Sequence, residues 1–192
     1  MAKYELNYEA LEDNKKKHSS ASEEFLSWIE SIVFSFFVVI LFFTFILRIA
    51  YVDGDSMLPT LENKDKLMVS YLFYTPKASD IVIVDSEGLE KYIVKRVIAV
   101  EGQTVDINFN TGEVMVDGVV LEESYINNLT QRDEGGHQYP VTVPDGCVFV
   151  MGDNRMNSTD SRSGLVGFVP VDDVVGKVFF RFFPFDRVNT FE

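Results

Sequence analysis

The hydrophobic positions of this chain form one long run near the N-terminus and many short runs after it. The long run, Ser31–Leu47, carries no charge and lies between Glu30 and Arg48. As a helix it would be roughly 26 Å long, close to the ~30 Å hydrocarbon core of a bilayer. It is apolar on all faces, whereas a helix that covers a soluble core has a polar stripe. We therefore predict a membrane-spanning helix rather than a buried core helix.

The residues around this run predict an uncleaved anchor and its orientation. Trp28 and Tyr51 flank the run, as interfacial aromatic residues do. Arg48-Ile49-Ala50 does not match the small-x-small site of a cleaved signal peptide. Lys15-Lys16-Lys17 precedes the run, and the positive-inside rule keeps such lysines in the cytoplasm. We expect a cytoplasmic tail (1–30), a transmembrane anchor at the plasma membrane (31–51) and an extracytoplasmic domain (52–192).

Beyond Tyr51 the hydrophobic runs are short, rich in Val, Ile, Phe and Tyr, and separated by turn residues. Asn110-Thr111-Gly112 and Asp117-Gly118 favour consecutive hairpins. We expect an all-β, mostly antiparallel folded sheet or barrel with a small inserted subdomain, and residues 121–139 read as a surface excursion. The predicted strands are 66–71, 81–84, 92–100, 104–109, 113–116, 119–121, 141–143, 147–151 and 176–183.

Composition and charge exclude several classes of function. There are 30 acidic against 17 basic residues, a formal charge of −13, so the clustered cations of a general nucleic-acid binder are missing. The single cysteine, Cys147, permits neither an intramolecular disulfide nor a CxxC motif. Of the two histidines, His18 lies in the predicted cytoplasmic tail and His137 in a predicted loop. We therefore expect no metal site, no histidine-based triad and no cofactor.

Without histidine, nucleophilic catalysis needs another base, and a lysine can serve if burial lowers its pKa from about 10.4. Lys95 lies in the apolar run Tyr92–Val100, where strand alternation places it on one face with Ile93 and Val97. The alternative is an edge-strand lysine that discourages aggregation.

Two further segments offer a nucleophile and its support. In GDSMLPTL, Ser56 lies on a predicted tight turn between Gly54, which allows unusual backbone angles, and Pro59, which fixes φ. A serine in such a turn is by itself an ordinary turn residue. The segment Gly152–Arg162 alternates Asp and Arg, as ordered ion pairs do, and a hydroxyl or carboxylate there could orient the base.

The order of these segments behind an N-terminal anchor resembles bacterial type I signal peptidases, the Ser-Lys proteases that remove signal peptides. The resemblance rests on GDSMLPTL, YIVKRVIAVEG and GDNRMNSTDSRSGLVGFVP, and it extends from the anchor to Pro170. It implies a membrane-bound serine endopeptidase that cleaves N-terminal signal peptides from exported preproteins without a cofactor. Ser56 would be the nucleophile and Lys95 the general base.

The same resemblance implies supporting residues and partners. Ser158 would hydrogen-bond to the lysine and orient it, the ion pair of Asp160 and Arg162 would brace the site, and Asp153 would be structural. Residues from about 103 to 144 would form the family's variable insert. The expected partners are preproteins that carry signal peptides, the lipid bilayer and the secretion translocon.

This chain departs from the family pattern at two positions. Gly54 stands where some members have a serine whose hydroxyl helps to form the oxyanion hole, so the backbone N–H of Ser56 must carry more of that role. Met156 stands where the motif often has a polar or acidic residue, which bears on local packing.

A preprotein would bind in extended form beside Tyr51–Asp53 and Tyr92–Val94 by β-addition. Met57 and Val94 would line shallow pockets for small side chains, typically Ala. Two other classes of protein remain open. A non-catalytic, signal-peptidase-like assembly factor would be expected to lack one residue of the dyad. A self-cleaving, repressor-type Ser-Lys protease would need a DNA-binding domain in place of the anchor.

Overall fold

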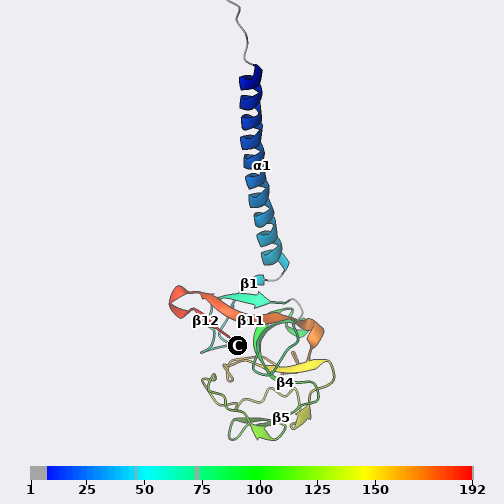
Figure 1. The fold of residues 1–192 in the computed structure, drawn as a ribbon. Coiled ribbons are helices and arrows are strands. Elements are labelled where there is room, and N and C mark those ends of the chain that lie inside the picture. Colours follow the sequence, from blue (N-terminus) through cyan, green and yellow to red (C-terminus); the bar gives the residue numbers. More distant parts are fainter. Residues whose placement is uncertain (1–7, 46, 72–73, 192) are drawn as a thin grey trace, which may run out of the picture. The chain divides into compact units, whose positions relative to one another are not determined.

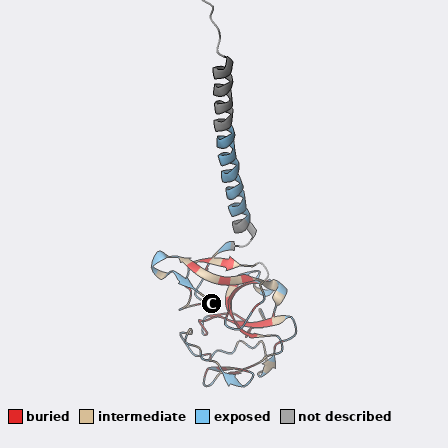
Figure 2. Ribbon diagram, viewed as in Figure 1, coloured by how far each residue is buried: buried red, intermediate tan, exposed pale blue. Residues whose placement is uncertain are grey.

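The computed structural model describes residues 8–45, 47–71 and 74–191, which divide into two units, 1–45 and 46–192. The first unit is one helix, α1 (Tyr8–Phe45), which begins inside the predicted tail (Figure 1). Within it, Glu23–Leu41 is long and apolar enough to cross a bilayer, and its side chains are exposed (Figure 2). An apolar helix is therefore confirmed, while residues 1–7 of the predicted tail lie outside the described part.

The helix ends before the predicted anchor does. Leu47–Tyr51 forms strand β1 and pairs antiparallel with β2 (Lys66–Ser70), from Leu47 opposite Ser70 to Tyr51 opposite Lys66. Short apolar segments fit a helix or a strand equally well by pattern, so the sequence did not distinguish the end of the helix from a new strand. The backbone pairing with β2 assigns residues 47–51 to the second unit.

The second unit contains an eight-stranded and a four-stranded antiparallel sheet, which confirms the predicted fold class. The remaining strands are β3 (Ile81–Ser86), β4 (Lys91–Val100), β5 (Thr104–Asn108), β6 (Glu113–Val116), β7 (Val119–Val120), β8 (Val141–Thr142), β9 (Cys147–Met151), β10 (Val169–Pro170), β11 (Val174–Phe183) and β12 (Asn189–Thr190). The main sheet has the order β1-β2-β11-β3-β4-β9-β10, with β12 beside β11, and the small sheet has the order β7-β6-β5-β8. Short 3-10 helices span Glu87–Leu89, Val171–Asp173 and Phe185–Arg187.

Every strand predicted from the pattern is present, with ends that differ by at most a few residues. The strands that the pattern missed are β1, β10 and β12. The last two are only two residues long, too short to show a period of two along the sequence. The small sheet lies inside the range predicted for the insert, and the stretch between β7 and β8 contains no strand (Figure 1).

The buried hydrophobic residues of the second unit form three clusters. Figure 2 shows buried segments in red along the strands. One cluster contains Met57 and Leu61 together with Leu67 on β2 and Val178 on β11, all at most 1% exposed. Burying such side chains contributes roughly 1.5–3 kcal/mol each. Because Met57 follows Ser56 directly, this cluster fixes the turn that carries the serine to the main sheet.

Candidate active site

Ser56 and Lys95, selected separately from the sequence, lie in contact. Lys95 Nζ is 2.9 Å from Ser56 Oγ and 3.0 Å from the carbonyl oxygen of Val94. Ser56 is half-buried in the turn after β1, and Lys95 on β4 is only 3% exposed. A serine hydroxyl and a lysine amine at hydrogen-bonding distance form the nucleophile and base arrangement that acyl transfer needs.

The surroundings of Lys95 favour its neutral form. Burial is the largest cause and lowers the pKa of Lys95 from 10.5 to about 8, because a charged ammonium is costly away from water. The negative charges of Asp160, Asp153 and Glu134 oppose this shift, while the positive charge of Lys91 adds to it. With a pKa of about 8, roughly a tenth of the lysine is neutral at pH 7.

The Ser56 turn is closely packed against the Gly152–Arg162 segment. A Cβ atom at Gly152 would lie 2.5 Å from the carbonyl oxygen of Ser56 and would collide with the hydroxyl of Ser158. Glycine is therefore required for this close approach. The absence of a side chain at Gly152 explains how a polar loop after β9 can lie directly against the backbone of Ser56.

Ser158 lies at the site without the contact predicted for it. It is 3% exposed, and its hydroxyl forms no hydrogen bond to Lys95 in this structure. Among the described residues, the Ser158 hydroxyl has no hydrogen-bond partner at all. Its role as the residue that orients the lysine stays a prediction.

Asp160 and Arg162 form a fully buried, bidentate ion pair. Asp160 Oδ1 accepts from Arg162 Nε at 2.8 Å, and Oδ2 accepts from Nη2 at 2.9 Å. The N–H of Gly152 also donates to Asp160 Oδ2 at 2.9 Å. Burial by itself would raise the pKa of Asp160, but the hydrogen bond and charge of Arg162 outweigh it, and the pKa lies below its usual value. Asp160 therefore stays ionised, and its negative charge acts on Lys95.

Asp153 is paired with the residue that follows Lys95 in β4. It accepts from Arg96 Nε at 2.8 Å and Nη2 at 2.6 Å, and from Thr60 Oγ1 at 2.5 Å. Arg96 Nη1 also donates to the carbonyl oxygen of Ser79 at 2.9 Å. These bonds connect β4, the Ser56 turn and the segment after β9, which is consistent with the structural role expected for Asp153.

One buried network of polar side chains, centred on Arg155, was not predicted from the sequence. Arg155 is fully buried, forms an ion pair with Glu123 and donates to Thr130 Oγ1 at 2.7 Å. The ring of Tyr125 lies 4.0 Å from the guanidinium carbon of Arg96. The stretch between β7 and β8 is thereby fixed to the motif after β9. Arg155 lies within that motif, but no sequence signal indicates which acidic residue pairs with it.

A groove of about 310 Å³ adjoins the serine and the lysine. Both predicted specificity residues, Met57 and Val94, line it, together with Tyr51–Asp53 and Tyr92. Within the described part of the chain, β1 pairs only with β2, and residues 92–95 of β4 pair only with β3. Each segment therefore has an unpaired backbone edge, as binding of an extended peptide by strand addition requires.

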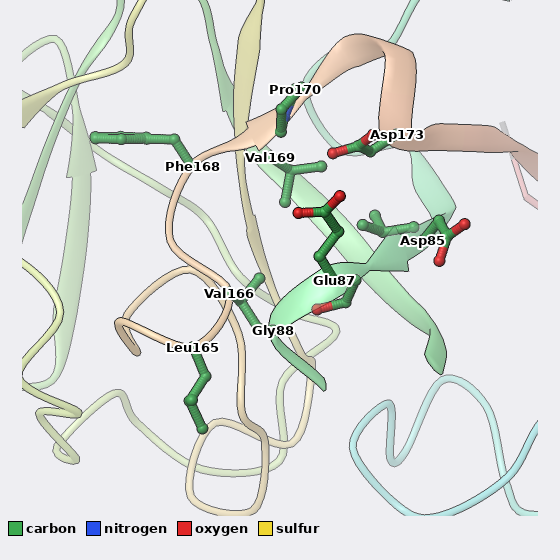
Figure 3. Close-up of a pocket in the computed structure, with 11 residues that line it drawn as sticks. Asp85, Glu87, Gly88, Leu165, Val166, Phe168, Val169, Pro170 and Asp173 are labelled. Carbon is green, nitrogen blue, oxygen red and sulfur yellow. The ribbon is translucent and has the colours of Figure 1, made fainter. Parts of the chain in front are cut away.

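A separate pocket of about 230 Å³ is lined by the carboxylates of Asp85, Glu87 and Asp173 (Figure 3). It contains neither Ser56 nor Lys95. Among the residues that the structure describes, no group of three or more His, Cys, Asp or Glu side chains is arranged to hold a metal ion. His137 lies against the ring of Phe168, with the ring centroids 4.5 Å apart.

Comparisons with known proteins identify one family. The family model described as "Signal peptidase, peptidase S26" matches residues 25–183. The chain is 44% identical over 154 residues to a probable signal peptidase I-1 from a Synechocystis species, covering 74% of each chain. It is 36% identical over 186 residues to signal peptidase I P from Bacillus subtilis subsp. natto, covering 92% of this chain and 97% of the relative.

Among solved structures, a crystal structure of a signal peptidase I from Enterococcus faecalis matches with 30% sequence identity and a TM-score of 0.45, covering 54% of this chain and 97% of that one. The family model, by contrast, spans most of the chain, from within α1 to the end of β11. The match with the relative from Bacillus subtilis subsp. natto covers nearly the whole length of both chains. On these two grounds, the chain belongs to the signal peptidase family, peptidase S26.

Proposed function

We propose that this protein is a membrane-anchored serine endopeptidase that cleaves N-terminal signal peptides from exported preproteins, with Ser56 as nucleophile and Lys95 as general base. The observation that supports this most directly is the 2.9 Å contact between Ser56 Oγ and a buried lysine amine. The names of the relatives, signal peptidase I, support the substrate class. The apolar span Glu23–Leu41 supports the anchor.

The reaction follows from this contact in two stages. The neutral amine of Lys95 takes the proton of Ser56 Oγ as that oxygen attacks the scissile carbonyl carbon. The N–H of Ser56 donates to the oxyanion that develops. The Lys95 ammonium then gives its proton to the leaving amine as the peptide bond breaks. Water deprotonated by Lys95 attacks the acyl ester, and the proton returns to Ser56 Oγ as the signal peptide leaves.

The substrate would bind as an additional strand in the groove. Its backbone would pair with the free edges at Tyr51–Asp53 and Tyr92–Val94, which line the same groove as the nucleophile. Met57 and Val94 would accept small side chains near the cleavage site. The two buried ion pairs, Asp160 with Arg162 and Asp153 with Arg96, would keep the motif after β9 in place.

The orientation of the chain in the membrane is a prediction from the sequence. Residues 1–30 would be cytoplasmic and the domain from residue 52 extracytoplasmic, because Lys15-Lys16-Lys17 precedes the apolar span. A catalytic domain on that side of the plasma membrane would meet preproteins as they emerge from the secretion translocon.

Cleavage of a preprotein by membranes that contain the full chain tests this function. Ser56→Ala and Lys95→Ala should each lower turnover by about a thousandfold or more, since each removes a participant in bond breaking. Ser124→Ala and Lys77→Ala are matched controls, because both residues are exposed and lie outside the groove. Turnover close to that of the wild type in either dyad variant would refute the assignment. If the wild type itself cleaved no more preprotein than membranes without this chain, a non-catalytic assembly factor that only holds substrates would be favoured instead.

A further inference from the structure

Asn154 contacts the backbone on both sides of the Ser56 α-carbon. Its side-chain Nδ2 donates to the carbonyl oxygen of Asp55 at 2.9 Å, and its backbone N–H donates to the carbonyl oxygen of Ser56 at 2.9 Å. Asn154 is 7% exposed, so neither bond competes with bulk water. The carbonyl oxygen of Asp55 also accepts from the N–H of Leu58 at 3.2 Å.

These bonds determine where the N–H of Ser56 points. The carbonyl of Asp55 and the N–H of Ser56 belong to one planar peptide unit, and in a trans unit the two groups point in opposite directions. A carbonyl held by two donors therefore fixes the direction of the N–H on the other side. Among the described residues, no acceptor bonds to this N–H, and Ser56 lines the groove.

The same bonds also strengthen the N–H as a donor. A hydrogen bond to an amide oxygen polarises the amide, and bonds in a chain reinforce one another by about 10–30%. The Asn154 amide, the Asp55–Ser56 peptide and an oxyanion in the groove would form such a chain.

Gly54, two residues before Ser56, offers little to an oxyanion. Gly54 has no hydroxyl, and its φ of +94° lies in a region that residues with side chains rarely adopt. Its own N–H already donates to Asn63 Oδ1 at 3.3 Å. The N–H of Ser56, in contrast, belongs to a residue that lines the groove, and no acceptor among the described residues bonds to it.

We propose that the Asn154 side chain is a positioning residue for the oxyanion donor, because it orients and polarises the Asp55–Ser56 peptide so that the Ser56 N–H meets the negative oxygen of the tetrahedral intermediate. The inference rests on the proposed role of Ser56 as the nucleophile. Asn154 acts on the peptide and not on the dyad, since its two donated bonds go to the backbone oxygens of Asp55 and Ser56.

The test compares Asn154→Asp and Asn154→Ala with the wild type, as full chains in detergent micelles. Asp keeps the size of the side chain but replaces the amide donor with a carboxylate. Ala removes the donor without adding charge. Asn128→Asp is the control, because Asn128 is exposed and lies outside the groove. Removing an oxyanion donor outright costs about 10²–10³ in kcat, so loosening its support should cost about 10- to 100-fold, with KM within about threefold.

The second readout uses a peptide aldehyde, whose hemiacetal with Ser56 Oγ places an oxygen where the oxyanion forms. Its inhibition constant should rise by the same factor by which kcat/KM falls, as expected for a mimic of the transition state. The ascending limb of the pH–rate profile should not move, because Lys95 keeps its environment. Unchanged kcat in Asn154→Ala, or unchanged aldehyde affinity when kcat falls, would overturn the inference.

A measurement on the wild type covers the case in which neither variant folds. In the aldehyde complex, the NMR signals of the Ser56 amide proton and of the Asn154 side-chain amide should both shift downfield. An Asn154 signal that does not move would again overturn the inference. If Ser56→Ala still cleaved a preprotein, the proposed function would fail, which is a different result from active Asn154 variants beside an inactive Ser56→Ala.

Discussion

Replacing Lys95 with methionine separates the cost of the buried base from its use in catalysis. Lys95 is 3% exposed and has a pKa of about 8 in the folded protein, against 10.5 for a lysine side chain in water. Methionine has a similar length and no charge, so it can occupy the same space. Catalysis should be lost, while the stability of the folded domain should depend less on pH.

The sign and size of the effect follow from the two pKa values. Between about pH 8 and pH 10.5 the unfolded chain keeps a proton on Lys95 that the folded chain has lost, so wild-type stability rises with pH in this window. The full difference of about 2.5 units corresponds to about 3 kcal/mol, of which roughly 2–3 kcal/mol is regained between pH 7 and pH 10. The variant lacks this dependence.

The variant also loses two hydrogen bonds of Lys95 Nζ, to Ser56 Oγ and to the carbonyl oxygen of Val94. Each is worth about 1 kcal/mol. Lys95→Met should therefore be about 1 kcal/mol more stable than the wild type at pH 7 and about 1 kcal/mol less stable at pH 10. The change of sign is the distinctive result.

Urea unfolding of both full chains in detergent micelles, followed by near-ultraviolet circular dichroism from pH 7 to pH 10, measures this difference. Because every other titrating group is common to both chains, their effects cancel in the comparison. A stability difference that stays constant with pH would show that the pKa of Lys95 is not lowered in the folded state, and the reasoning would be refuted.

Three other substitutions test the site. Gly152→Ala should lower kcat by at least about a hundredfold by displacing the nucleophile's backbone, whereas Gly164→Ala, which has open space around its α-carbon, should remain active in the same cleavage assay. Asp160→Asn removes the charge that most strongly raises the pKa of Lys95, so the ascending limb of the pH–rate profile should move to lower pH; an upward shift would contradict this. Arg155→Ala leaves its buried carboxylate partner unpaired and should lower the unfolding free energy by about 3–5 kcal/mol in urea; a loss under 1 kcal/mol would contradict it.

The fold class could be predicted from the sequence, and Ser56 and Lys95 could be selected from it, because their signals are local. Alternating and short apolar runs with turn residues between them mark the strands. A lysine inside the apolar run Tyr92–Val100 fits a buried position or an edge strand, and a serine between Gly54 and Pro59 indicates a tight turn. These patterns depend on residues within about ten positions of each other.

The remaining features depend on partners that are distant in the chain. Arg155 pairs with Glu123, and Asn154 with the carbonyl of Asp55, across 32 and 99 positions. Nothing in the local pattern of either residue selects its partner. The change from helix to strand after Phe45 is likewise decided by pairing with β2 and not by the apolar residues themselves.

The most direct test of Ser56 as the nucleophile is to trap the acyl-enzyme. An ester of a signal-peptide sequence, chosen so that deacylation is slow, is mixed with the full chain and quenched in acid, and the acylated residue is located by mass spectrometry. The proposal predicts the acyl group on Ser56 in the wild type and no acylation of Ser56→Ala. An acyl group on any other side chain, or continued turnover by Ser56→Ala, would contradict it.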